Sequence, residues 1–225
     1  MIPYKDDNPT GLFPYVTIAI IVLNSALYLW GLFSPSAERE IASSYGAVPY
    51  NLLTLEKHQP IHPLVTVFSS MFLHGGILHV AGNMLYLWIF GNNIEERLGH
   101  LRFLAFYLAA GIVAAYAHAV AEPASHIPMI GASGAVSGVL GAYLLLFPRA
   151  RVHTVILLGF FWQVVRVPAL IVIGFWAIIQ LASGLLAKGL PGQGGVAWFA
   201  HIGGFLFGLI TIKLWLPRRR FTQWL

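Results

Sequence analysis

The sequence of 225 residues contains no cysteine and few charged residues, and each shortage excludes a class of protein. Without cysteine there is no disulfide, no thiolate nucleophile and no thiolate metal site, and the redox compartment is left open. Charged residues make up 9% of the chain, whereas a soluble domain carries about 25%. Together with a hydrophobic content of 58%, this composition indicates a polytopic membrane protein.

Acidic residues are scarce as well, which limits the buried charges that the protein can use. The chain has eight aspartates and glutamates, no aspartate follows Asp7, and none of these acids lies in the middle of an apolar run. An intramembrane carboxylate, which would mark a proton relay or orient a buried histidine, is therefore missing.

The net charge of +5 does not indicate a nucleic-acid partner, because of where the basic residues lie. The one dense cluster, Arg218 to Arg220, directly follows an apolar run, which is typical of an anchor that flanks a membrane. No basic surface with interleaved aromatic residues is evident in the sequence. We expect this chain to be embedded in the lipid bilayer and to bind no nucleic acid.

Six apolar runs are about long enough to cross a bilayer, which takes roughly 20 helical residues. We therefore predict an all-α membrane protein, a single domain over residues 1–225 that forms a bundle of six transmembrane helices. The first run is longer than a signal-peptide core and lacks a basic lead, so we expect it to be retained. The predicted helices cover about residues 13–33, 75–92, 101–121, 130–147, 168–187 and 196–216.

The segments between these helices are expected to be irregular. Residues 1–11 are interpreted as a short polar lead, residues 34–63 as a long loop and residues 93–99 as a short charged turn. Two further segments are apolar but too short to span, and we expect the first to lie in the interface or to pack under the loop before it, and the second to lie in the interface or to dip into the membrane. These segments are residues 64–73 and 154–166.

The basic residues test the predicted topology. With a cytoplasmic N-terminus, only Arg39, Lys57 and Lys188 of the thirteen lysines and arginines lie outside, and the other ten lie inside. This asymmetry is what the positive-inside rule expects. We therefore expect a multi-pass integral membrane protein of a bacterial plasma membrane, with both termini cytoplasmic.

Under this topology the second, fourth and sixth helices run from outside to inside, and each carries polar residues in its first turns. Ser133 lies three residues past the predicted start of the fourth helix, and His201 about five past that of the sixth. On the second helix, His79 and Asn83 are spaced i, i+4 and share one face. At about 1.5 Å per residue, most of these groups lie roughly 5–12 Å below the outer surface. Because polar residues in membrane helices are costly, they are functional candidates.

Small residues predict how these helices pack. Glycines with the spacing small-xxx-small leave a helix face bare, so that the backbone of another helix can come close. If the two bare faces meet, His201 is carried toward Ser133. The glycine pairs are Gly204 and Gly208 on the sixth helix, and Gly134 and Gly138 on the fourth.

Such an approach would create a nucleophile and its base. An imidazole within about 2.6–3.2 Å of the Ser133 hydroxyl accepts its proton and later returns it to a leaving amine. The backbone N–H of Ser133, the His79 ring and the Asn83 amide are at the right depth to stabilise an oxyanion.

Three motifs together resemble the rhomboid intramembrane serine proteases. They are HGGILHVAGN at 74–83, GASG at 131–134 and AHIGGFLFG at 200–208, and their order and the six-helix core also match. The resemblance covers roughly residues 65–208. It implies a rhomboid-like bundle in which Ser133 is the nucleophile, His201 the general base, and His79 and Asn83 part of the oxyanion hole.

The resemblance also implies further features of site and substrate. Gly131 would shape the turn that enters the serine helix, and Glu95 and Arg97 match a structural Glu-x-Arg pattern of the family. Substrates would be transmembrane segments of other proteins with destabilised helices, entering laterally near the fifth helix. Hydrolysis would use an acyl-enzyme and neither metal nor organic cofactor.

The sequence departs from the family pattern at two places. The Trp-Arg pair common in the first loop is absent, and the loop reads HQPIHP at 58–63. Ser137 stands where an aromatic residue often stacks against the catalytic histidine, which suggests that His201 is oriented differently here.

The same residues also have interpretations that do not involve serine catalysis. Ser133 alone would usually be a packing residue, His201 a hydrogen-bonded interior histidine, and His74 a hydrogen-bonding residue at a helix start. A zinc site from His74, His79 and His118 lacks both a His-Glu-x-x-His motif and a nearby acid.

Two alternative functions remain open at this stage. One is a rhomboid-fold pseudoprotease that binds membrane clients without cutting, although such proteins usually lack the serine or the histidine. The other is a channel or transporter, against which stand the missing intramembrane acid and the absence of an inverted repeat. The sequence indicates neither the oligomeric state nor the substrate.

Overall fold

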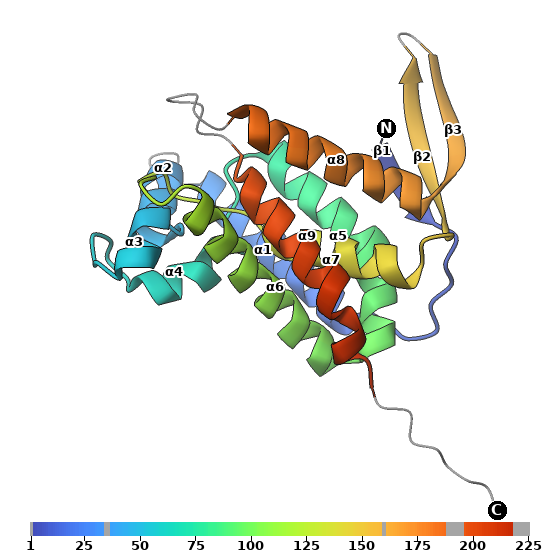
Figure 1. Ribbon diagram of the computed structural model, residues 1–225, viewed down its shortest axis with the longest axis horizontal. Helices are drawn as coiled ribbons and strands as arrows, with labels where there is room; N and C mark the ends of the chain where they lie inside the picture. The colour runs from blue at the N-terminus through green and yellow to red at the C-terminus, as the bar shows by residue number, and fades with distance from the viewer. Residues whose placement is uncertain (1, 34–36, 159–160, 188–195, 218–225) are drawn as a thin grey trace, which may run out of the picture.

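The computed structural model describes residues 2–33, 37–158, 161–187 and 196–217, which form a helical bundle with a small sheet at one end (Figure 1). The helices are α1 (Tyr15–Leu32), α2 (Ala37–Tyr45), α3 (Pro49–Thr54), α4 (Pro63–Ser70), α5 (Ile77–Leu98), α6 (His100–Ala121), α7 (Ser133–Leu146), α8 (Ala169–Ala187) and α9 (Trp198–Trp215). The strands are β1 (Ile2–Asp6), β2 (Arg151–Leu158) and β3 (Phe161–Pro168).

Helix α7 is the centre of the bundle. Every residue from Gly134 to Tyr143 is buried, although the helix has only 14 residues. Aromatic side chains from α5 and α6 fill the space beside its second half, and the ring of Phe90 meets that of Tyr143 edge-on at 4.8 Å. A helix that is buried on all sides must satisfy its backbone internally, which the α-helix does.

The bare faces of α7 and α9 meet, as the glycine spacing predicts. A Cβ atom added at Gly204 would collide with the carbonyl oxygen of Gly134, and one at Gly208 with that of Gly138. Backbone-to-backbone packing of this kind is how small residues hold membrane helices together.

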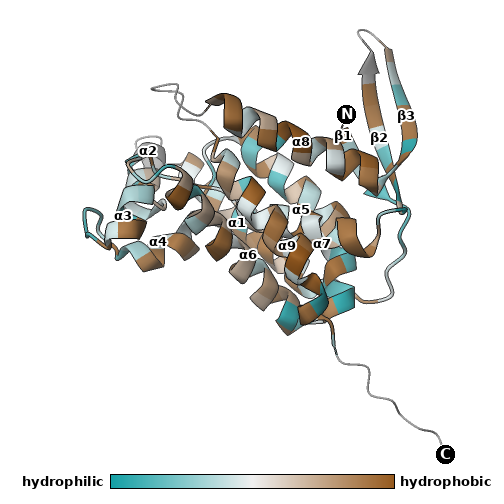
Figure 2. Cartoon of the chain, viewed as in Figure 1, coloured by the Kyte–Doolittle hydropathy of each residue, from teal (hydrophilic) through white to brown (hydrophobic). Residues whose placement is uncertain are grey.

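Four described helices are long and apolar enough to cross a membrane, namely α1, α6, α8 and α9. Helix α7 is apolar but shorter, and α5 carries polar and charged residues in its last turns. Figure 2 shows the hydrophobic residues along the bundle and hydrophilic ones near the junction of α5 with α6 and in the loops of α2 and α3.

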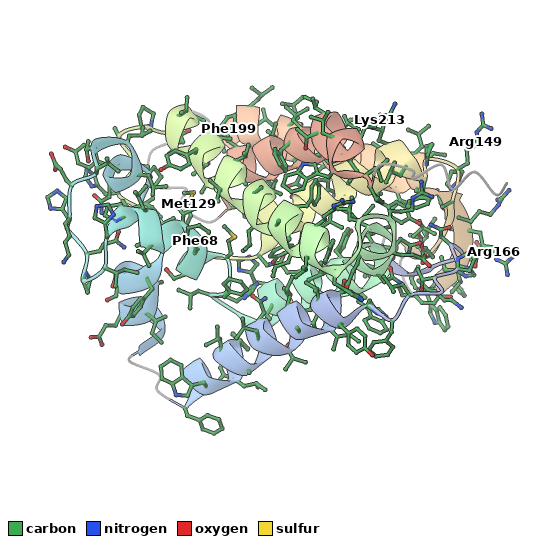
Figure 3. All side chains as sticks on the ribbon, turned by 90° about the horizontal axis from the view of Figure 1, so that it is seen from below. Phe68, Met129, Arg149, Arg166, Phe199 and Lys213 are labelled. Carbon is green, nitrogen blue, oxygen red and sulfur yellow. The ribbon has the colours of Figure 1, made fainter. Side chains whose placement is uncertain are left out.

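Three basic side chains on which the predicted topology depends lie at one end of the bundle. Figure 3 shows Arg149, Arg166 and Lys213 at one end, while Phe68 and Met129 lie toward the other. Lys188 and the cluster from Arg218 to Arg220, on which the expected charge distribution also depends, lie outside the described residues.

The prediction of an all-helical chain is wrong for three segments. The N-terminal segment, predicted to be an irregular polar lead, contains β1. The described residues of the apolar segment 154–166 belong to the antiparallel strands β2 and β3. Strand β1 pairs with β2 from Ile2 opposite Val155 to Asp6 opposite Val152, with a bulge between Pro3 and Lys5. The hairpin is rich in β-branched residues, which favour strands over a short interfacial helix.

Other predicted boundaries shift as well. Residues 93–98, expected to be a charged turn, are the last turns of α5, and the chain breaks at Gly99, whose φ of 77° suits glycine. The long first loop contains α2 and α3, and the apolar segment after it forms α4.

The charged end of α5 holds the start of α1. The Glu95 carboxylate is fully buried and accepts hydrogen bonds from the backbone N–H groups of Val16 and Thr17, at 2.9 and 2.8 Å, and from the Thr17 hydroxyl at 2.7 Å. It also contacts the His100 ring at 2.6 Å. The first N–H groups of a helix have no intrahelical acceptor, so this carboxylate caps α1 from a distant part of the chain.

Replacing Glu95 with glutamine is therefore expected to destabilise the protein by about 2–4 kcal/mol, because an amide NH2 would face buried donors. The Glu96→Gln variant is the matched control, since the half-buried Glu96 uses a single oxygen to cap Gly11 and Leu12 and a glutamine retains one. Thermal unfolding in detergent measures the difference. Equal stability of the two variants would show that Glu95 does not anchor α1.

Candidate active site

Ser133 is the first residue of α7, and not the fourth residue of a helix as the sequence suggested. The chain enters this helix through Gly131, whose φ of 128° is rarely adopted by residues with a side chain. A Cβ atom there would also lie 2.7 Å from Nε2 of His79. The Gly131 N–H donates to the carbonyl oxygen of Ser70 at 2.8 Å and so ties the turn to α4. Glycine is thus required at 131 by conformation and by space.

His201 lies in the first turn of α9 and faces Ser133. Its Nε2 is 2.8 Å from the Ser133 Oγ, although 68 residues separate the two along the chain. The close packing of α7 on α9 explains this distance. The backbones meet at Gly134, which directly follows Ser133, and at Gly204, which lies about one turn after His201. A hydroxyl and an imidazole at this distance form a nucleophile and base in hydrogen-bond reach.

His79 and Asn83 lie on the α5 face that borders this pair. The Asn83 Nδ2 is 2.9 Å from Nε2 of His74, and the His74 and His79 rings meet edge-on at 5.0 Å. The backbone N–H of Ala132 also approaches the same His74 nitrogen, at 3.4 Å. His74 therefore holds the Asn83 amide and the residue before the serine together.

The protonation of His74 follows from its surroundings in the loop before α5. Burial, and secondarily the neighbouring His79, lower the pKa of His74 to about 4. The ring is therefore neutral near pH 7, and its Nε2 can accept the hydrogen bond from Asn83. This accords with the hydrogen-bonding interpretation of His74.

The start of α7 provides donors of its own. The first N–H groups of an α-helix lack intrahelical acceptors and carry the positive end of the helix dipole. Because Ser133 is the first helical residue, its N–H is one of these groups. A negative charge beside the Ser133 N–H would be favoured by this end of the helix dipole.

Ser137, where an aromatic residue was expected by resemblance, serves the helix backbone instead. Its hydroxyl donates to the carbonyl oxygen of Ser133 at 2.6 Å. The rings near His201 come from elsewhere: Trp176 on α8 and Trp198 on α9, each with its centroid 6.2 Å from the imidazole. The aromatic neighbours of this histidine are thus indoles of α8 and α9 and not a ring of the serine helix.

Gln180, which contacts the other nitrogen of His201, was not predicted from the sequence. Its Oε1 lies 2.6 Å from the His201 Nδ1, and the side chain is buried. Only carboxylates were expected as partners of a buried histidine. A signal was present, because Gln180 is the single amide of α8, whose residues are otherwise apolar except for Ser183.

Among the described residues, no three His, Asp or Glu side chains lie close enough to hold a metal ion. His74 and His79 are neighbours, while His118 packs against Phe199, with ring centroids 6.3 Å apart.

Comparison with known proteins agrees with the motifs. The family model described as "Rhomboid domain" matches residues 62–218. "Rhomboid protease GluP" of Bacillus subtilis (strain 168) is 31% identical over 217 residues, which cover 96% of this chain and 37% of that protein. "RHOMBOID-like protein 1" of Arabidopsis thaliana is 27% identical over 232 residues, covering 93% and 55%.

A human relative, "Presenilin-associated rhomboid-like protein, mitochondrial", is 32% identical over 142 residues, covering 62% of this chain and 35% of that protein. This chain therefore spans between about a third and just over half of the length of these relatives. One of these relatives is named a protease, and the other two are named rhomboid-like proteins.

Proposed function

We propose that this chain, which belongs to the rhomboid family of integral membrane proteins, is a serine endopeptidase that cuts transmembrane segments of other proteins. The observation that supports this most is the 2.8 Å separation of the Ser133 Oγ and the His201 Nε2. Both residues lie in helices that pack backbone to backbone, so their distance is held by the bundle and not by a mobile loop.

The reaction follows from the positions of these two side chains. The Ser133 Oγ attacks the carbonyl carbon of the scissile peptide bond, and Nε2 of His201 accepts its proton. As the tetrahedral intermediate collapses, the imidazolium gives that proton to the leaving amine, and an acyl-Ser133 ester is left. Water then attacks the ester with His201 again as base, which releases the acid and restores the serine.

The oxyanion of each intermediate needs donors that are already in place. We assign this role to the Ser133 N–H, to the His79 ring and to the hydrogen of the Asn83 amide that His74 does not use. Gly131 and Gly134 support the site because neither position has room for a side chain. A side chain at Gly131 would collide with His79, and one at Gly134 would collide with Ala114.

Replacing Asn83 with alanine is expected to lower the rate of serine labelling and of cleavage by about 10²- to 10³-fold, the usual effect of losing one oxyanion donor. The Asn24→Ala variant is a matched control, because Asn24 is an equally buried amide that donates to Ile20 within α1. A fluorophosphonate probe measures both rates on purified protein. An Asn83→Ala rate within about threefold of the control would remove Asn83 from the site.

We also propose which helices span the membrane and on which side the termini lie. We take α5 and α7 as spans in addition to the four long apolar helices, which makes six spans in one domain over residues 1–225. Both termini would be cytoplasmic and the membrane would be a bacterial plasma membrane, with Arg149, Arg166 and Lys213 inside. Substrate would approach laterally beside α8, and the chemistry would need neither metal nor organic cofactor.

Reconstitution with substrate tests the activity. Purified protein in liposomes is mixed with single-span proteins tagged at both ends, some carrying helix-destabilising residues within the span. Wild type is expected to produce two tagged fragments that are absent with Ser133→Ala. Capture of the same proteins without fragments would instead indicate a client-binding pseudoprotease.

A further inference from the structure

Gln180 is placed to decide which nitrogen of His201 carries the proton. The Gln180 Oε1 lies 2.6 Å from Nδ1, and the Ser133 Oγ lies 2.8 Å from Nε2. A neutral imidazole has one N–H and one bare nitrogen. The amide oxygen only accepts, so in this contact the proton is on Nδ1 and the bare nitrogen is Nε2. That nitrogen is the one that must remove the serine proton.

The opposite tautomer would be unreactive in this geometry. With the proton on Nε2, the imidazole would donate to the serine oxygen instead of accepting from it. No described carboxylate is available to prevent this, because the acids lie near the ends of the bundle or in its loops. Gln180 is the side chain on which the choice of tautomer depends.

We propose that Gln180 is the positioning residue of the base, so that the site operates as Ser133, His201 and Gln180 rather than as a serine and histidine alone. This inference rests on the proposed proteolytic function of Ser133 and His201. With its oxygen on Nδ1, the amide favours this tautomer and ring plane without adding a negative charge beside the imidazolium. A neutral partner also avoids the cost of a charge at membrane depth.

The position of Gln180 on α8 couples that helix to the base. Between residues 174 and 187, Gln180 and Gly184 are the only buried residues of α8. Gly184 packs on Trp198 and Ile202 of α9, which flank His201 in the sequence. Residues 174–187 of α8 thus meet α9 through the ring of Trp176, the close approach at Gly184 and the hydrogen bond of Gln180. A substrate that moved α8 away from α9 would break that bond and release the His201 ring.

Two substitutions separate positioning from packing. Gln180→Leu keeps the size of the side chain and removes the acceptor, and we expect the fluorophosphonate labelling rate to fall by about 10- to 100-fold with the thermal stability retained. Gln180→Glu restores an acceptor, so the rate at alkaline pH should return to within about tenfold of wild type. Its charge favours the protonated imidazole, so the lower limb of the pH–rate profile should move up by about one pH unit or more.

The other titratable groups near His201 are His79 on α5 and His118 on α6, and both are unchanged in these variants. Gln163→Leu is the matched control, since Gln163 is an exposed amide on strand β3, outside the helices that carry the site. It should label at the wild-type rate. Wild-type labelling of Gln180→Leu, or an unshifted profile and unrecovered rate in Gln180→Glu, would overturn the proposal.

A direct measurement separates this inference from the proposed function. With 15N-histidine incorporated, the His201 resonances are assigned by comparison with His201→Ala, and the two nitrogens report the tautomer. We expect the proton on Nδ1 in wild type and a loss of that preference in Gln180→Leu. A wild-type proton on Nε2 overturns the role of Gln180, whereas a serine that no probe labels, with the Nδ1 tautomer present, overturns the proteolytic function alone.

Discussion

Alanine in place of Ser133 or of His201 is expected to reduce cleavage to background, a loss of at least about 10⁴-fold, while the protein still inserts and folds. In the proposed mechanism the Ser133 Oγ forms the ester bond of the acyl-enzyme, and no other hydroxyl among the described residues is hydrogen-bonded to His201. Without His201 no base removes the serine proton, and a neutral hydroxyl is a weak nucleophile. Each single variant should therefore be as inactive as the double variant.

Two controls make this prediction specific. Ser69→Ala removes a hydroxyl that bonds the Tyr45 carbonyl oxygen, and His153→Ala removes an imidazole paired with Asp7 at the basic end of the bundle. Both should cleave like wild type. Cleavage by a Ser133→Ala protein purified free of wild type would contradict the assignment of the nucleophile.

The second large effect is expected at the contact between α7 and α9. Gly204→Ala adds a methyl group where the carbonyl oxygen of Gly134 already lies, so the two backbones must separate. Overpacking of this kind costs about 1–3 kcal/mol of stability. The same separation moves His201 away from Ser133, and a misplacement of about 1 Å in an active site lowers the rate by about 10²-fold. We therefore expect at least that loss of labelling.

A matched glycine substitution shows whether position matters. Gly174→Ala lies in α8 with no atom within 4 Å of the added methyl group, so it should leave both stability and labelling unchanged. Thermal unfolding in detergent and fluorophosphonate labelling give the two quantities for each variant. A Gly204→Ala protein that unfolds and labels like Gly174→Ala would refute the close backbone contact as the support of the site.

Much of this arrangement could be predicted from the spacing of residues within helices. The stripe of His201 with its two glycines and the pair His79 and Asn83 depend only on the helical period, which a sequence displays directly. The family assignment drawn from these motifs is confirmed by the match over residues 62–218. The roles of the individual residues in catalysis remain predictions.

The features that were missed depend on contacts between distant segments. The strand β1 forms because β2 offers an edge roughly 150 residues later, and a short polar lead carries no sign of that partner. The continuation of α5 through residues 93–98 is likewise stabilised from outside, by α1 groups that bond to Glu95. Charged residues alone predicted a turn there.

Gln180 was missed for a chemical reason. A carboxylate was the only partner considered for the buried histidine, and because the apolar runs contain none, the sequence predicted a serine and a histidine without a third residue. Only the distance of 2.6 Å to the His201 Nδ1 distinguishes the two. The start of α7 also depended on tertiary structure, since the left-handed turn at Gly131 delays the helix until Ser133.

Labelling of the purified protein with a fluorophosphonate in detergent tests whether Ser133 is a nucleophile activated by His201. We predict one covalent adduct in wild type, located at Ser133 by mass spectrometry of the digested protein, and no adduct in Ser133→Ala or His201→Ala. An unlabelled wild type, or an adduct that persists in Ser133→Ala, would contradict it.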